Sequence, residues 1–148
     1  MKRLCVIPCG NKKIWDKEPH LGKAEAQFAY IGTFHLLCQQ YARVFFDDWV
    51  ILSAKHGFLR PSDYVPGNYD VSFNMKSDEL INLEQLKMQS ADKSLSQYKS
   101  FVVLGGKKFR PIIETIFEGE YIYPLESCTG IGYMQQKLKK ALLANHEI

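Results

Sequence analysis

Long apolar runs are missing from this sequence of 148 residues. None approaches the roughly 20 residues that a membrane-spanning helix needs. The opening Met1-Lys2-Arg3 leads into only a few apolar residues, whereas a signal peptide has a longer apolar core. We therefore expect a cytoplasmic protein with no membrane partner, and the length fits one α/β domain over residues 1–148.

Motifs for metals and nucleotides are also missing. The four cysteines form no Cys-x-x-Cys pair and no zinc-ligand spacing, since they stand at positions 5, 9, 38 and 128. We expect reduced thiols and no metal site. Gly105-Gly106-Lys107 lacks the full spacing of a P-loop, which argues against a Walker-type nucleotide hydrolase. No cofactor is indicated.

A strong net charge is absent too, because 19 basic residues oppose 16 acidic ones and leave a charge of +3. That sum is too small to indicate a nucleic-acid partner, so the distribution of charge matters more. Basic residues gather in 10–23, 55–60 and 105–110, while acidic residues lie mostly in 78–92 and 114–126. Each basic loop, taken alone, is best explained as solvated surface.

What the sequence does have is a repeated pattern, a short apolar run that ends in a loop carrying lysine. The runs cover 4–7, 49–52 and 101–104, and the lysines after them are Lys12, Lys13, Lys55, Lys107 and Lys108. In an open α/β sheet, ligands bind beyond the carboxyl ends of the strands. The pattern therefore predicts a basic anion-binding site at that edge.

Segments with helical spacing of apolar residues alternate with these strands. They cover 26–44, Ser77 to about Ser90, 107–117 and 130–144, and a fourth strand is expected at 121–125. This alternation favours a three-layer α/β/α sandwich with a mostly parallel central sheet of about four strands. Residues 58–75 show no period and contain Pro61, Pro66 and Gly67, which predicts an irregular excursion.

The motifs Ser53-Ala54-Lys55-His56-Gly57 and Tyr69-Asp70 resemble those of a bacterial and phage family of uncharacterised proteins. That family opens with a strand ending in Cys-(Ser or Gly)-x-Lys-Lys, which corresponds here to Cys9-Gly10-Asn11-Lys12-Lys13. A Tyr-x-Gly-x-Phe element of the family corresponds to residues 30–34. The resemblance spans most of the chain.

A similar skeleton also resembles the core domain of archaeosine synthase, an enzyme that modifies a base in transfer RNA. The shared parts are the Pro8-Cys9 loop, the loop after the next strand and the Tyr69-Asp70 pair. This resemblance implies a uracil-DNA-glycosylase-like fold and a connection with nucleobases. A nucleic acid, nucleotide or nucleoside is then the expected ligand. The glycosylase motifs themselves have no residue-by-residue match in the chain.

Asp70 and His56 are the candidate catalytic residues. A carboxylate can stabilise the developing oxocarbenium ion or orient water during N-glycosidic cleavage. His56 can serve as a general acid or base near neutral pH, and either it or Lys55 can stabilise the departing base. Asp70 equally suits hydrogen bonding within the turn over 67–70, and the family resemblance leaves these two interpretations balanced.

The other candidate site residues would bind the substrate. They are Cys9, Gly10, Asn11, Lys12, Lys13, Ser53, Lys55, Gly57, Tyr69, Gly105 and Gly106. The glycines either bring backbone N–H groups close to a phosphate or only shape turns. Tyr69, Trp15 and Phe58 either stack on a base or pack in the core. Cys9 is either a nucleophile or structural.

Two functions from different classes follow from these residues. The first is an enzyme that processes a nucleobase or nucleic acid by N-glycosidic cleavage or base transfer, with Asp70 and His56 catalytic. The second is a non-catalytic module whose basic rim binds nucleic acid or a nucleotide. DNA, RNA and free nucleosides all remain candidate ligands, and no oligomeric state is indicated.

Overall fold

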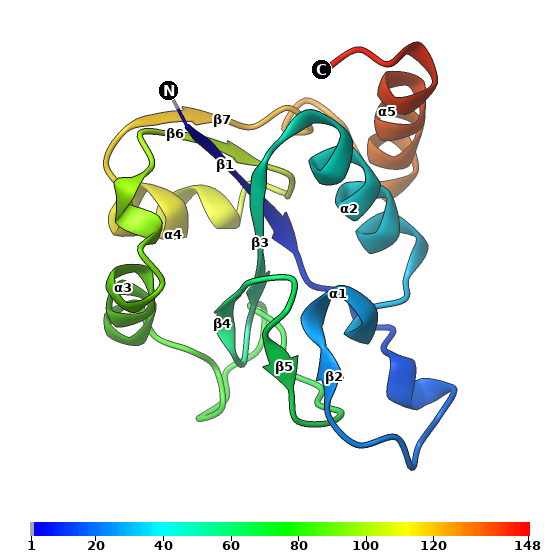
Figure 1. The fold of residues 1–148 in the computed structure, drawn as a ribbon, viewed down its shortest axis with the longest axis vertical. Coiled ribbons are helices and arrows are strands. Elements are labelled where there is room, and N and C mark those ends of the chain that lie inside the picture. The colour runs from blue at the N-terminus through cyan, green and yellow to red at the C-terminus, as the bar shows by residue number, and fades with distance from the viewer. Residues whose placement is uncertain (1) are drawn as a thin grey trace.

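A computed structural model describes residues 2–148, and at its centre lies a five-stranded sheet in the order β4-β3-β1-β6-β7 (Figure 1). The parallel strands are β1 (Arg3–Pro8), β3 (Asp48–Ser53), β6 (Ser100–Val103) and β7 (Glu120–Ile122). Strand β4 (Gly57–Leu59) runs antiparallel beside β3. The mostly parallel sheet is confirmed, with five strands instead of about four.

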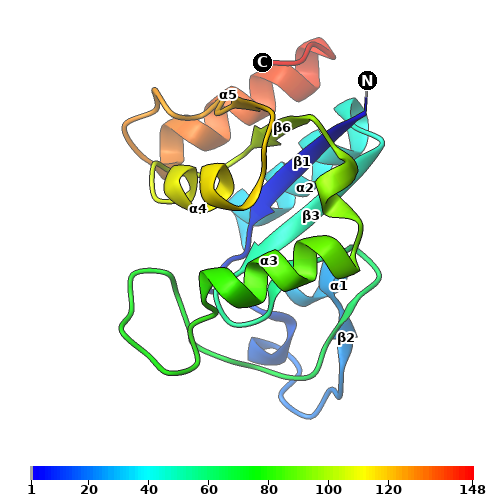
Figure 2. The ribbon, with the colours of Figure 1, turned by 90° about the vertical axis from the view of Figure 1, so that its left-hand side faces the viewer.

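The central strands are buried on both faces because they are apolar at nearly every position. Alternate side chains point to opposite faces. One set, which includes Ile7 and Ile51, packs with helices α2 (Thr33–Phe45) and α5 (Ile131–Ala144). The other set, which includes Val6 and Val50, packs with α3 (Leu83–Asp92) and α4 (Phe109–Ile116). Figure 2 shows α3 and α4 in front of the sheet and α2 behind it.

Strands β1 and β6 are neighbours whose connections leave in opposite directions. The chain passes from β1 through α2 to β3, and from β6 through α4 to β7 on the other side. Because α2 and α4 cover opposite faces, the loops after β1 and β6 diverge at the carboxyl edge. Such a topological switch point is where open α/β sheets form a crevice for ligands.

The helix predicted over 26–44 is interrupted. Between α1 (Ala26–Ala29) and α2 the backbone is extended over 30–32. This segment pairs with the loop after β1, where the Ile31 N–H donates to the Lys12 carbonyl at 3.0 Å. The long-range pairing therefore replaces one helical turn.

The segment predicted to be irregular, 58–75, contains two short strands. Strand β4 turns back along β3, and the turn is made at Gly57, whose φ is +74°. Strand β5 (Tyr64–Val65) pairs antiparallel with β2 (Ala24–Glu25). The rest of this excursion is loop, as predicted.

Helix α3 begins at Leu83 instead of near Ser77. Its N-cap is Asn82, whose side chain accepts a hydrogen bond from the Gln85 N–H at 2.8 Å. The Gln85 side chain accepts in return from the Asn82 N–H at 3.0 Å, which completes a capping box. The helices predicted at 107–117 and 130–144 are present as α4 and α5 with slightly shifted ends.

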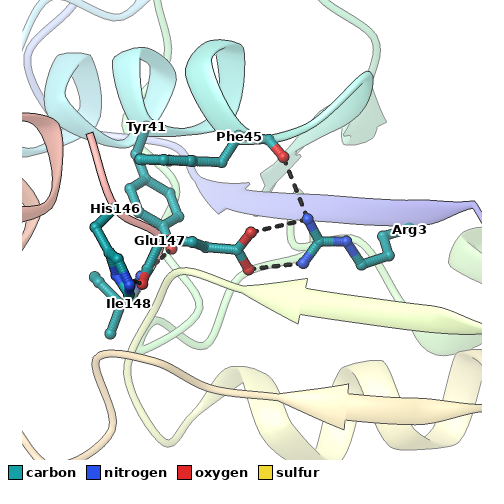
Figure 3. Close-up of polar contacts among 6 residues, drawn as sticks. All are labelled: Arg3, Tyr41, Phe45, His146, Glu147 and Ile148. Carbon is teal, nitrogen blue, oxygen red and sulfur yellow. Dashed lines mark hydrogen bonds and ion pairs between the residues drawn. The ribbon is translucent and has the colours of Figure 1, made fainter.

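Side chains near the two ends of the described chain are in contact at the amino edge of the sheet (Figure 3). The Arg3 guanidinium forms a two-pronged ion pair with Glu147, with N···O distances of 2.7 and 2.9 Å. Arg3 also donates to the Phe45 carbonyl at 3.3 Å, and the Ile148 N–H donates to the Tyr41 hydroxyl at 3.0 Å. These contacts fasten the C-terminal segment to β1 and α2.

Candidate functional site

A cavity of about 510 Å³ opens at the carboxyl edge of the sheet, at the switch point between β1 and β6. The loop after β1 contributes Cys9, Gly10 and Asn11 to its wall, and the loop after β6 contributes Gly105 and Gly106. Pockets of roughly 300–1,000 Å³ are the usual size for small-molecule ligands. The structure thus brings five of the predicted substrate-binding residues together around one cavity.

The cavity is lined mostly by apolar side chains. Three phenylalanine rings contribute, and two of them, Phe73 and Phe109, meet edge to face with centroids 5.7 Å apart. The third is Phe34, at the start of α2. The polar side chains of the wall are Asn11, Thr33, His35, Ser72, Lys108 and Gln135, and no carboxylate of the described chain lines it. A flat apolar ligand with a few polar edges would suit this lining.

Gly105 lies buried directly beneath the Phe109 ring. A Cβ at this position would lie 2.3 Å from the nearest ring atom, whereas a Cβ at Gly106 would meet nothing within 4 Å. Only a glycine at 105 therefore allows the ring to keep its place in the cavity wall.

We expect Gly105→Ala to displace the Phe109 ring and to destabilise the protein by about 1–3 kcal/mol, which is typical of overpacking. Gly106→Ala is the matched control and should unfold nearly as the wild type does. Urea denaturation at neutral pH measures both. Equal stability of the two variants would contradict the close packing of Phe109 on Gly105.

His35 is a residue of the cavity wall that sequence reasoning missed. Its Nδ1 lies 2.8 Å from the Pro8 carbonyl and its Nε2 lies 2.8 Å from the Gln39 side-chain nitrogen. Nδ1 therefore carries the proton and donates to the carbonyl, while Nε2 accepts from the amide. Burial lowers the pKa of His35 to about 4, so the ring is neutral at pH 7 and fastens α2 to the end of β1. The only available signal was a histidine in an apolar helical face.

A chain of hydrogen-bonded hydroxyl groups joins the loop after β3 to the irregular segment 58–75. The Tyr69 hydroxyl is hydrogen-bonded to the Ser53 hydroxyl at 2.8 Å and also to the Tyr30 hydroxyl. Ser53 Oγ accepts in turn from the N–H groups of Lys55 and His56, at 3.3 and 3.0 Å. Burial raises the pKa of Tyr30 to about 12 and raises that of Tyr69 as well, so both hydroxyls stay protonated. Ser53 and Tyr69 thus hold the backbone of the loop after β3 in place, and neither side chain lines the cavity.

Lys13 was predicted to bind an anion, but the structure buries its side chain, which is 3% exposed as a residue. Its Nζ lies 4.4 Å from the centroid of the Tyr69 ring and donates to the Asn11 carbonyl at 3.1 Å. Burial lowers the pKa of Lys13, although Cys9 and nearby carboxylates act in the opposite direction. Lys13 therefore supports the loop after β1 from behind the cavity wall.

The candidate catalytic residues do not line the cavity. Asp70 is exposed, and it directly precedes Val71 and Ser72, which do belong to the wall. The half-buried His56 ring packs edge-on against Tyr69 with centroids 4.9 Å apart. Burial, followed by the charge of Lys55, lowers the pKa of His56, so this ring is neutral at pH 7. Asp70 thus adjoins the cavity wall along the chain, whereas His56 packs on Tyr69 outside the wall.

The remaining predicted residues lie at different places. Lys12 is exposed beside Gly32, a wall residue, with its Cβ 3.8 Å from where a Cβ of Gly32 would be. Lys55 forms an ion pair with Glu79 at 3.2 Å. Gly57 lies against α3 and shapes the turn before β4.

Two of the aromatic residues considered for base stacking belong to the core. Trp15 is buried and donates from Nε1 to the carbonyls of Leu21 and Gly22, each at 2.9 Å. Phe58 is buried between the sheet and the α3–α4 layer. The aromatic rings that face the cavity come instead from α2, the excursion and α4.

Neither a metal-binding cluster of side chains nor a membrane-spanning helix is found among the described residues. Within residues 2–148, no group of three or more His, Cys, Asp or Glu side chains is placed to hold a metal ion. None of the helices in that range has the length and apolar character needed to cross a bilayer.

Comparison with known proteins identifies relatives but no structural precedent. The chain is 50% identical over 150 residues to the "Uncharacterized protein YfjM" of Bacillus subtilis (strain 168), with both chains covered completely. No solved structure matches. The pattern of the family of unknown function DUF6884 matches residues 4–140. The predicted membership of an uncharacterised bacterial family is confirmed: the chain belongs to the DUF6884 family.

Proposed function

We propose that the protein processes a nucleobase-bearing ligand, by N-glycosidic cleavage or base transfer, and that the base enters the cavity at the switch point. The observation that carries this proposal is a cavity of about 510 Å³ whose mostly apolar wall includes three phenylalanine rings. Every nucleobase offers a π-face for stacking and a polar edge for a small number of hydrogen bonds. The side chains of Asn11, Thr33 and Gln135 would supply such bonds.

Asp70 and His56 would act on the sugar of the ligand, which would project from the mouth of the cavity. Asp70 stands next to the wall residues Val71 and Ser72, so a sugar at the mouth would come near its carboxylate. The carboxylate would stabilise positive charge on the sugar or orient water. His56 is neutral at pH 7 and would accept a proton.

Replacing Asp70 with asparagine tests the enzymatic proposal. Turnover, measured as base released from nucleosides, nucleotides and oligonucleotides, should fall at least about a hundredfold. Ligand affinity should stay near the wild-type value. Asp47→Asn is the matched control, because Asp47 is also exposed but precedes β3 at the amino edge. Full turnover in the Asp70 variant would refute the assigned role.

A second candidate function is a non-catalytic module that binds a nucleotide or nucleic acid. The observation that favours it is the absence of a carboxylate from the described residues of the cavity wall. In this case Asp70 only shapes its loop, and Asp70→Asn would change neither binding nor any released product. Binding without base release in the wild type would support this module over the enzyme.

A further inference from the structure

Several basic residues of the segments predicted to form an anion-binding rim already have partners. Lys55 is paired with Glu79 at 3.2 Å. Arg110 contacts two carboxylates, those of Glu114 and Glu126. Lys13 is buried, and Arg60 donates to the Lys93 carbonyl at 2.5 Å. The basic segments therefore offer less free positive charge than their composition indicates.

Within the described residues, one lysine side chain, that of Lys108, lines the cavity. Lys108 is exposed, and the exposed Lys107 precedes it. Neither forms an ion pair within residues 2–148. Lys12 lies beside the wall residue Gly32 but does not itself line the cavity.

The backbone of the same loop offers further donors. Over the described chain, no hydrogen bond uses the N–H groups of residues 105–108, although the Gly106 and Lys107 carbonyls accept from Phe109 and Arg110 at 3.2 Å each. The Gly106 Cα is open on its side-chain face, with nothing within 4 Å of a Cβ. Consecutive unpaired N–H groups beside an ammonium group are the usual environment for a phosphate.

We infer that the ligand carries a single phosphate-sized anion bound by the 105–108 loop and Lys108, so that the substrate is a mononucleotide and not a nucleic-acid polymer. This inference rests on the proposed binding of a base in the cavity. The base would occupy the apolar part, and the phosphate would lie where Lys108 borders it. A polymer needs a track of several cations to neutralise successive phosphates. Among the described residues Lys108 is the one lysine or arginine that lines the cavity, while Lys13 is buried and Lys55 is paired with Glu79.

Calorimetric titration of the full chain with the common ribonucleosides, their 5′-monophosphates, inorganic phosphate, and short DNA and RNA oligonucleotides tests the inference. The best monophosphate should bind at least tenfold more tightly than its nucleoside, and inorganic phosphate should compete with it. The affinity of the monophosphate should fall only weakly as the salt concentration rises, because a single phosphate has no condensed counterions to release. Oligonucleotides should bind more weakly than the monophosphate.

Two lysine variants locate the anion. Lys108→Met should remove the preference for the monophosphate over the nucleoside, whereas Lys55→Met should retain it because Lys55 is paired with Glu79. Equal affinity for nucleoside and monophosphate, or an unchanged preference in Lys108→Met, overturns the phosphate site and leaves the proposed function standing. Tighter, steeply salt-dependent binding of an oligonucleotide overturns the choice of a mononucleotide. Binding of none of these ligands overturns the proposed function together with the inference.

Discussion

Replacing His35 with asparagine is expected to flatten the dependence of stability on pH between about pH 6.5 and pH 4. In the wild type, burial lowers the pKa of His35 from 6.5 to about 4. The unfolded chain therefore binds a proton in this range that the folded chain does not, so stability falls as the pH falls from 6.5 and is constant above it. At about 1.4 kcal/mol per pKa unit, His35 alone accounts for a loss of about 3 kcal/mol.

Denaturation at about pH 7 and about pH 4.5 measures this effect. Asparagine keeps an N–H donor for the Pro8 carbonyl but has no proton to gain. The His35 variant should be less stable than the wild type at pH 7, and most of the difference should disappear in acid. His20→Asn is the control, because His20 is exposed. Parallel pH curves for wild type and the His35 variant would show that the ring is not held neutral.

The comparison between variants is needed because His35 does not act alone. Burial and, to a smaller extent, the charge of Lys55 also lower the pKa of His56. Protonation of His56 therefore lowers the stability of the fold in acid as well. Asp63 acts at lower pH, since Lys93 and the Arg60 N–H hold the pKa of its carboxyl below 3.8 against the effect of burial. Its contribution is present above that pH and is lost in stronger acid. Subtracting the two curves isolates His35.

Gly57→Ala is expected to cost at least about 3 kcal/mol of stability. Gly57 has φ of +74°, a conformation that costs a residue with a Cβ roughly 1–2 kcal/mol. The new Cβ would also lie 2.0 Å from Gln89 Oε1. That oxygen accepts from the Phe58 N–H at 2.8 Å, and the Gln89 amide donates to the His56 carbonyl at 2.8 Å. Displacing Gln89 leaves these backbone groups unpaired, at about 1–3 kcal/mol each.

Gly67→Ala is the control for this substitution, because Gly67 has no positive φ and a Cβ there meets nothing within 4 Å. Urea denaturation should show a large loss for Gly57→Ala and almost none for Gly67→Ala. Adding Gln89→Ala to the first variant should cost less than it does in the wild type, since the clash is then relieved. Equal stability of the two glycine variants would contradict the conclusion that Gly57 makes a strained turn packed against α3.

The strands that the sequence predicted are those with a local signal. The runs at 4–7, 49–53 and 101–104 are apolar at every position but Ser53 and end at polar or glycine-containing loops, so each identifies itself without reference to the rest of the chain. Strands β4 and β5 have only three and two residues. They exist because of pairing with distant segments, which a local pattern does not encode.

In the candidate site too, residues with a local sequence signal could be predicted, and residues placed by long-range packing could not. Cys9 and Gly105 could be placed at the cavity because they follow predicted parallel strands, whose carboxyl ends share an edge. Phe73 could not, because its position depends on how the excursion folds back over the sheet. The burial of Lys13 was equally hidden, since a lysine is almost never buried without a specific partner, here the Tyr69 ring and the Asn11 carbonyl.

The contact between Arg3 and Glu147 places both ends of the described chain at the edge opposite the cavity (Figure 1). A linker or surface anchor attached at residue 2 or residue 148 would therefore leave the cavity open to solution. Because both ends lie on the same side of the molecule, a peptide linker would join them in a circular permutant without crossing the cavity. New ends could then be opened elsewhere, while β1 kept its central place in the sheet.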